Sequence, residues 1–146
     1  MNFCRQLSIL ALSVVIGICL VSCEKKKQGK VVIAEQEFTM QEDKENTFRI
    51  DARGKIRNVG EVDVKNVVVT GYCRSCGEEW IPGKWFVSSD AEKLPEQKAV
   101  INFLPAGGES EFSFMRVADM LLTAGQSPPE LPEKMEVVIE SFEIVE

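Results

Sequence analysis

The segment FRIDARGKIRN, Phe48–Asn58, alternates between apolar or small residues and polar, mostly charged ones. One set is Phe48, Ile50, Ala52, Gly54 and Ile56, and the other is Arg49, Asp51, Arg53, Lys55 and Arg57. A period of two residues belongs to a β-strand with one face in the core and one in water, as is common in antiparallel sheets. An α-helix would require a period of 3.6 residues. The segment therefore predicts a half-buried antiparallel strand.

Turn signals divide the rest of the chain into further short strands. These are expected at Val64–Tyr72, Lys84–Ser89, Lys98–Leu104, Glu111–Arg116 and Lys134–Val145. The run Val67–Val69 does not alternate, which fits a central strand buried on both faces or a β-bulge, and a change of parity near Glu140 indicates another bulge. The segment Val117–Gly125 has helical spacing and ends in glycine, so a short helix is expected after the Phe112–Met115 strand. The pattern predicts an all-β sandwich.

The beginning of the chain has the layout of a secretory signal. A short segment with one basic residue, Arg5, precedes an apolar run of 15 residues, Leu7–Val21. This run is short for a membrane span, which needs about 20 residues. It ends in Leu-Val-Ser-Cys, which resembles the lipobox of bacterial lipoproteins. The resemblance implies cleavage between Ser22 and Cys23 and lipidation of Cys23, whose several acyl chains would anchor the protein stably.

This layout divides the chain into three expected segments. Residues 1–22 form the cleaved signal peptide, residues 23–30 a lipidated cysteine with a flexible basic tether, and residues 31–146 a single β-sandwich domain. The lysines of the tether would attract anionic headgroups or simply keep the tether solvated. Up to Lys30 the chain holds 5 of the 17 basic and 1 of the 23 acidic residues, which leaves the domain with 12 basic and 22 acidic residues, a net charge of −10.

Composition also bounds the possible chemistry. The chain contains no histidine, which removes the usual general base and every Ser-His-Asp or Cys-His arrangement. Carboxylate spacing singles out no acid–base pair. The formal charge of −6 argues against a nucleic-acid partner, because no basic field would attract phosphates. We therefore expect a protein that is not an enzyme and has neither catalytic residues nor a cofactor.

Two cysteines follow Cys23 in the sequence: Cys73 and Cys76, in the stretch GYCRSCGEEW. A disulfide is geometrically reasonable, since residues i and i+3 of a tight turn can bring their Cα atoms within about 6 Å. A zinc site would need about four ligands, so two chains could share the pair, or Glu78 and Glu79 could complete a poorer site. A redox role would need a lowered thiol pKa, which Glu78 and Glu79 oppose. A disulfide can form and persist outside the cytoplasmic membrane, where a lipoprotein is carried. All three interpretations stay open.

Aromatic residues surround this cysteine pair in the sequence. They are Tyr72, Trp80 and Trp85. Such a density is typical of a contact patch for a partner, or of packing at the end of a sandwich core. Both interpretations are kept.

Two stretches carry characteristically spaced residues: glycine, isoleucine, asparagine, valine and tyrosine in the first, and proline, glycine and phenylalanine in the second. In ARGKIRNVGEVDVKNVVVTGY the positions are Gly54, Ile56, Asn58, Val67, Val69 and Tyr72, and in INFLPAGGESEFSF they are Pro105, Gly107, Phe112 and Phe114. The pattern resembles the FxLyD-type immunoglobulin-like domains of bacterial envelope proteins over roughly Phe48–Met115. The resemblance implies an immunoglobulin-like antiparallel β-sandwich of about seven strands with a binding or scaffolding role. The cysteine pair is not part of the pattern.

These features indicate a membrane-anchored lipoprotein of the cell envelope. Its partners would be the lipid bilayer, through acylated Cys23, and an unknown envelope protein. Glu24 follows the lipidated residue, where lipoproteins retained in the inner membrane typically have aspartate, so the outer membrane facing the periplasm is implied for a Gram-negative organism. The alternative is a metal-binding or thiol-redox lipoprotein that acts through Cys73 and Cys76.

Overall fold

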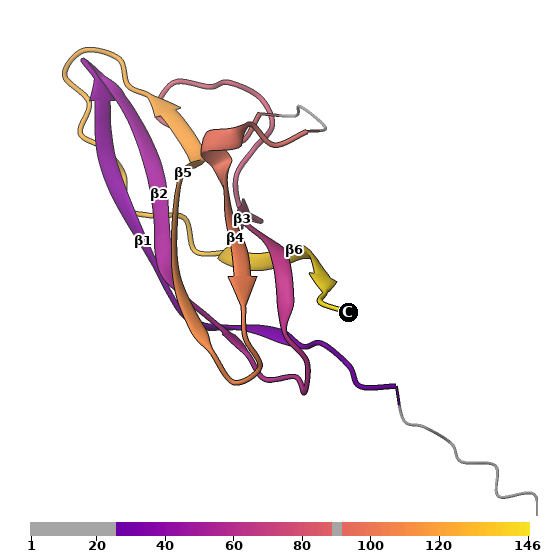
Figure 1. The fold of residues 1–146 in the computed structure, drawn as a ribbon. Helices are drawn as coiled ribbons and strands as arrows, with labels where there is room; N and C mark the ends of the chain where they lie inside the picture. Colours follow the sequence, from indigo (N-terminus) through magenta and orange to yellow (C-terminus); the bar gives the residue numbers. More distant parts are fainter. Residues whose placement is uncertain (1–25, 89–91) are drawn as a thin grey trace, which may run out of the picture.

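The computed structural model describes residues 26–88 and 92–146 (Figure 1). The expected signal peptide, the cleavage position and the lipidation site Cys23 lie outside these residues. The elements are β1 (Val31–Lys44), β2 (Thr47–Asn58), β3 (Val64–Cys73), the 3-10 turn η1 (Pro95–Gln97), β4 (Lys98–Leu104), β5 (Glu109–Leu121) and β6 (Met135–Ile144). Among the described residues no helix is long and apolar enough to cross a bilayer.

The strands form two antiparallel sheets of three strands each. The first sheet has the order β1-β2-β5 and the second the order β4-β3-β6. β1 and β2 form a hairpin whose turn contains Asn46 with φ of 62°, a left-handed conformation that asparagine tolerates better than most residues. The predicted strand at Phe48–Asn58 is confirmed as β2, the central strand of the first sheet, and the all-β class is confirmed with it.

Both sheets contribute to one hydrophobic core. Ile50 and Ile56 from β2 and Val67 and Val69 from β3 are fully buried in the same cluster. The sheets are also joined by a hydrogen bond of 3.0 Å from the Val137 backbone N–H to the side-chain oxygen of Gln36. The alternating apolar residues of the sequence therefore meet residues of the other sheet rather than solvent.

The irregular valine run in β3 is explained by β-bulges, one of the two alternatives that its pattern indicated, whereas burial on both faces is not complete, since Val68 is only half-buried. β3 is the central strand of its sheet, and its pairing with β6 slips between Lys65 and Val68, where Asn66 has a φ of 51°. A second slip places an additional residue, Glu140, in β6 opposite the step from Val68 to Val69. The predicted bulge near Glu140 is confirmed.

The predicted helix over Val117–Gly125 is wrong, because β5 continues to Leu121. A step of two residues in β2, from Ile50 to Ala52, lies opposite a step of four residues in β5, from Phe114 to Ala118. Arg116 has a φ of 60° within this bulge. The bulge changes the face on which apolar side chains fall. Val117, Ala118 and Met120 are all buried, so their spacing imitates a helical face although the strand is extended.

The expected strand at Lys84–Ser89 is also wrong. The structure describes this stretch up to Ser88, and only Phe86 pairs there, in isolated bridges with Gly77 and Asp119. The described residues contain six strands, not about seven. Extended backbone that pairs at a single residue does not make a strand.

Asn58 is completely buried where β2 ends, and it organises the turns around it. Its side-chain nitrogen donates to the carbonyl oxygens of Val62 at 2.8 Å and Leu104 at 3.2 Å. Its side-chain oxygen accepts from the Gly60 N–H at 3.0 Å. A buried amide with three partners joins the 58–63 turn to the end of β4.

The Asn58→Ala variant should be less stable by about 2 kcal/mol or more, because buried backbone groups lose their partners. Urea unfolding monitored by circular dichroism measures the loss. The matched control is Asn102→Ala, which removes an exposed asparagine from β4 and should stay within about 0.5 kcal/mol of the native protein. Equal stability of the two variants would contradict the organising role of Asn58.

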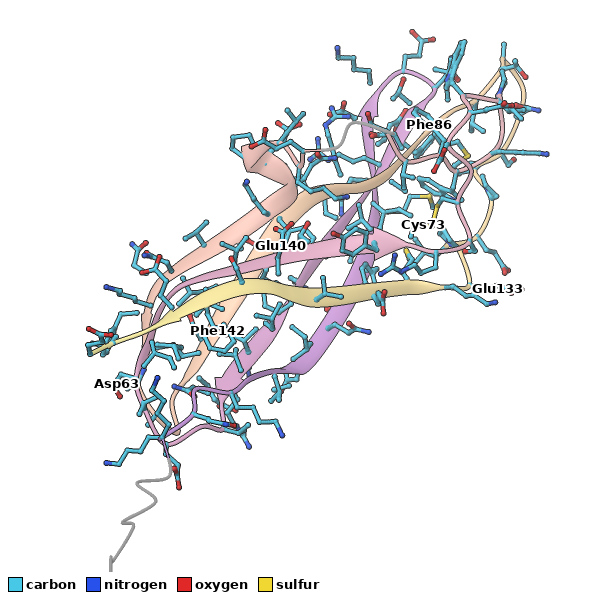
Figure 2. The ribbon with its side chains drawn as sticks, turned by 90° about the vertical axis from the view of Figure 1, so that its right-hand side faces the viewer. Asp63, Cys73, Phe86, Glu133, Glu140 and Phe142 are labelled. Carbon is cyan, nitrogen blue, oxygen red and sulfur yellow. A yellow bond between two sulfur atoms is a disulfide. The ribbon has the colours of Figure 1, made fainter. Side chains whose placement is uncertain are left out.

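The chain reaches the sheets at the end that carries this turn. The carbonyl of Lys30 accepts hydrogen bonds from the N–H groups of Val59 at 2.8 Å and Gly60 at 3.2 Å, and that of Gln28 accepts one from Glu61 at 3.2 Å. We call this the proximal end, formed by the 58–63 and 105–108 turns. Asp63 marks it in Figure 2, and Cys73 and Phe86 lie at the opposite end.

Candidate functional site

The segment between β3 and the 3-10 turn begins with the cysteine pair. Cys73, the last residue of β3, is joined to Cys76 by a disulfide with a Cα–Cα distance of 5.4 Å. Between them, the N–H of Arg74 donates to the carbonyl of Lys134 at 2.7 Å. We call residues 74–88 the disulfide loop. Its first residues are held both by the sulfur bridge and by the start of β6.

The disulfide loop is held a second time where it returns along β5. Phe86 and Asp119 exchange two backbone hydrogen bonds of 2.9 Å each, and the Gly83 N–H donates to Leu121 at 2.8 Å. Within the loop, the N–H of Val87 donates to the carbonyl of Gly77 at 2.9 Å. These contacts cover the edge of β5 that β2 does not pair. The exposed residues 77–82 therefore project from a loop that is fixed on both sides.

The three predicted contact aromatics occupy three different environments. Trp85 is 9% exposed, belongs to the core and donates from its indole N–H to the Glu130 carbonyl at 3.0 Å. Tyr72 is half-buried, with the guanidinium of Arg74 at 4.5 Å and the Lys93 ammonium at 4.9 Å from its ring centre. Trp80 is 57% exposed. The expected patch is thus not one surface, and only Trp80 is largely available to a partner.

Sequence reasoning missed the neighbour of Trp80. Ile81 is 40% exposed, although isoleucine is among the residues most often buried. The signal that would have indicated it is the stretch Trp-Ile-Pro-Gly, in which two large apolar residues directly precede a turn. Trp80 and Ile81 together form the apolar tip of the disulfide loop.

Two open hollows flank this tip. One, of about 430 Å³, is lined by Ser75, Gly77, Glu78, Glu79, Ile81, Lys84 and Trp85. The other, of about 260 Å³, lies between Trp80, Phe86 and the end of β5. The apolar tip therefore has concave surface on both sides, with glutamates beside the first hollow.

A larger hollow of about 700 Å³ lies on the solvent face of the first sheet. Its charged walls pair with one another: Arg53 with Glu37 at 2.8 Å and Lys55 with Glu35 at 3.6 Å. Such exposed pairs compete with any ligand for the same charges, and each contributes little to stability. We therefore place the candidate site at the disulfide loop.

An ionic cluster supports the base of the second hollow. Arg116 pairs with Asp43 at 2.7 Å, Asp119 at 2.7 Å and Glu96 at 3.1 Å. Arg49 pairs with Asp43 at 2.6 Å. The cluster connects β1 and β5, the two neighbours of β2, with the 3-10 turn. Arg116 lies in the β5 bulge, and its guanidinium pairs with three carboxylates. These ion pairs stabilise the β5 bulge beneath the disulfide loop.

The charges of this cluster shift the pKa values of its carboxyl groups in opposite directions. Burial disfavours the charge of Asp43, but the Arg116 and Arg49 guanidiniums outweigh burial and hold the pKa of Asp43 below its usual value. Burial raises the pKa of Asp119, and Arg116 offsets it only in part. Asp119 is held by the loop through its backbone, so this carboxyl lies directly beneath the disulfide loop.

The cysteine pair has no free sulfur to offer in this state. Both sulfurs are used by the disulfide, and Cys73 is 7% exposed. Among residues 26–88 and 92–146, no group of three or more cysteine or carboxylate side chains is arranged to hold a metal ion. The geometry is that of a braced loop with an apolar tip. Searches of protein-family models, curated proteins and solved structures find no match to this chain.

Proposed function

We propose that the protein is a lipoprotein of the cell envelope, anchored in the bilayer by acylated Cys23. The support is the order of the N-terminal features: a basic residue, an apolar run of 15 residues and a small residue before the cysteine. In a Gram-negative organism it is carried on the outer membrane and faces the periplasm, in keeping with Glu24 after the lipidated residue.

The domain beyond the tether is, in this proposal, a non-catalytic immunoglobulin-like sandwich of the FxLyD type. Two antiparallel sheets with one shared core are compatible with such an architecture. Asn58 of the sequence pattern is buried at the turn after β2. A fold of this kind presents loops at its two ends and typically serves binding.

The binding role depends on one observation, the exposed tip of the disulfide loop. Trp80 is 57% exposed, yet the loop that carries it is tied to β5, β6 and Cys73. Tryptophan is enriched among the residues that dominate binding energy at protein interfaces. A loop fixed before binding loses little conformational entropy when a partner docks. The tip therefore fits a contact with an envelope protein.

The alternative, a metal-binding or redox lipoprotein, would require the disulfide to open. Reduced Cys73 would remain largely covered, whereas reactive thiols are usually accessible and close to positive charge. The acidic pair Glu78 and Glu79 lies on the same loop. We therefore favour the braced loop as the working element and treat the disulfide as its support.

A photo-crosslinking amino acid at position 81 tests the binding role in living cells. We expect one discrete crosslinked product in the envelope fraction. Adding Trp80→Ala should remove most of it, since a central interface tryptophan contributes about 2 kcal/mol or more, roughly a 30-fold change in affinity. The crosslinker at Val100, which is 53% exposed on β4, is the matched control and should give no product.

Two outcomes would contradict the proposed contact. One is the absence of a discrete product from position 81 while the protein is folded and anchored. The other is a product that persists unchanged with Trp80→Ala. Leu131→Ala, which truncates another partly exposed apolar residue, should leave the product intact and shows that the loss is specific to Trp80.

A further inference from the structure

The chain is fixed to the proximal end as far as Gln28. The carbonyl groups of Lys30 and Gln28 accept the N–H groups of the 58–63 turn, as described above. Cys23 lies five positions before Gln28 in the sequence. A fully extended chain spans at most about 3.3–3.6 Å per residue, so the acylated residue lies within about 18 Å of the proximal end.

This reach is short compared with the length of the domain. β2 alone has 12 residues, which corresponds to about 40 Å at a rise of about 3.3 Å per residue. Figures 1 and 2 both draw the described start of the chain at one end of the sheets and the disulfide loop at the other. A lipid-anchored Cys23 would therefore keep the proximal end next to the bilayer.

Exposed apolar side chains gather at this end. Val59 is 47% exposed, Phe103 54% and Ile144 44%. Asn58, beside Val59, is hydrogen-bonded to the carbonyl of Leu104, which follows Phe103. Val64 pairs with both Leu104 and Ile144 in the second sheet. The three residues thus lie on neighbouring turns and strand ends around the point where the tether leaves.

The tether brings positive charge to this end. Lys26, Lys27 and Lys30 precede β1, and none of them forms an ion pair with another residue of the described ranges 26–88 and 92–146. Glu143 forms an ion pair with Lys65 at 3.7 Å, and the charged Asp63 accepts a hydrogen bond from the Ala106 N–H at 2.9 Å. The body after Lys30 carries −10, so lying flat would bring repelled charge onto anionic lipids.

We infer that the proximal end rests on the bilayer, with Val59, Phe103 and Ile144 in the interface and the tether lysines among anionic headgroups. The domain then stands on this end and presents the disulfide loop away from the membrane. Lysines near an anionic surface contribute attraction that falls off within a Debye length, and partly exposed apolar side chains gain from entering the headgroup boundary. The inference rests on the proposed anchoring through Cys23.

Fluorescence quenching by brominated lipids tests this orientation on the full-length acylated protein. The protein is reconstituted in vesicles of phosphatidylethanolamine and phosphatidylglycerol, with and without bromine on the acyl chains. The native Trp80 and Trp85 belong to the far end and should not be quenched. In Phe103→Trp the added indole should lose about half of its emission in brominated vesicles, as expected for a group at the acyl boundary. Phosphatidylcholine vesicles should reduce this quenching.

Leu94→Trp is the matched control, because Leu94 is 52% exposed and precedes the 3-10 turn, away from the proximal end. Its indole should not be quenched. Vesicle flotation is measured in the same samples. Flotation without quenching in Phe103→Trp, or equal quenching of all variants and the native protein, would overturn the orientation and leave the anchor intact. Loss of flotation would overturn the anchor and the orientation with it.

Discussion

Replacing Cys23 with serine is expected to abolish incorporation of labelled fatty acid into the protein. The serine cannot form the thioether that carries the diacylglyceryl group, so the acyl chains have no attachment point. The loss of labelling should be nearly complete, because every acyl chain is carried by Cys23. Metabolic labelling followed by cell fractionation and immunoblotting measures it.

The matched control for this variant is Cys19→Ser. Cys19 lies in the apolar run, four residues before Cys23, and has no role in the lipobox pattern. Its loss should leave both labelling and membrane association unchanged. Persistent labelling of the Cys23→Ser protein would exclude Cys23 as the acylated residue.

Gly54→Ala is expected to have the largest effect on folding. A Cβ atom at Gly54 would lie 2.0 Å from the backbone oxygen of Glu35 and 2.8 Å from the Phe112 ring. The pairing of β1 with β2 slips between Ile33 and Glu35, which brings this carbonyl over the glycine. The backbone of Glu35 cannot move aside as a flexible side chain can. We therefore expect the free energy of unfolding to fall by about 3 kcal/mol or more.

Urea unfolding of purified Gly54→Ala measures this loss. The control is Gly77→Ala, because a Cβ there meets its nearest atoms at 3.9 Å, an ordinary contact distance. That variant should remain within about 0.5 kcal/mol of the native protein. Native-like stability of Gly54→Ala would show that β1 does not cross β2 as described.

The strands of the fold were predictable where side chains alternate. β2 follows directly from the charged and apolar faces of Phe48–Asn58, and the bulge at Glu140 from a change of parity. The end of β5 was not predictable in the same way, because a bulge at Arg116 shifts the apolar face and imitates a helix. The bulge is held by Asp43, which lies 73 residues earlier in the chain. Local periodicity contains no information on such a contact.

The candidate site was predictable only in part. The position of the disulfide followed from the spacing of Cys73 and Cys76, which a tight turn can join. The roles of the aromatics did not, since they depend on distant chain segments. Trp85 is buried and its indole reaches Glu130, 45 residues later, while the Trp80 indole has no hydrogen-bond partner in the described part of the chain and remains exposed. Sequence spacing alone treats the two tryptophans alike.

The proposed anchoring and orientation give the two ends of the domain opposite roles. The proximal end receives the tether and carries Val59 and Phe103 toward the bilayer. The far end carries Trp80 on a loop braced by the disulfide and by β5. A rigid β-domain between an anchor and a contact loop would hold that loop at a set distance from the membrane.

The most direct test is the mass of the mature protein purified from membranes. The expected mature chain begins at Cys23, and its N-terminal residue carries the added mass of a diacylglyceryl group on the sulfur and of an acyl chain on the amino group. A chain that begins at Met1, or one that begins at Cys23 without lipid, would contradict the anchoring on which the proposed function rests.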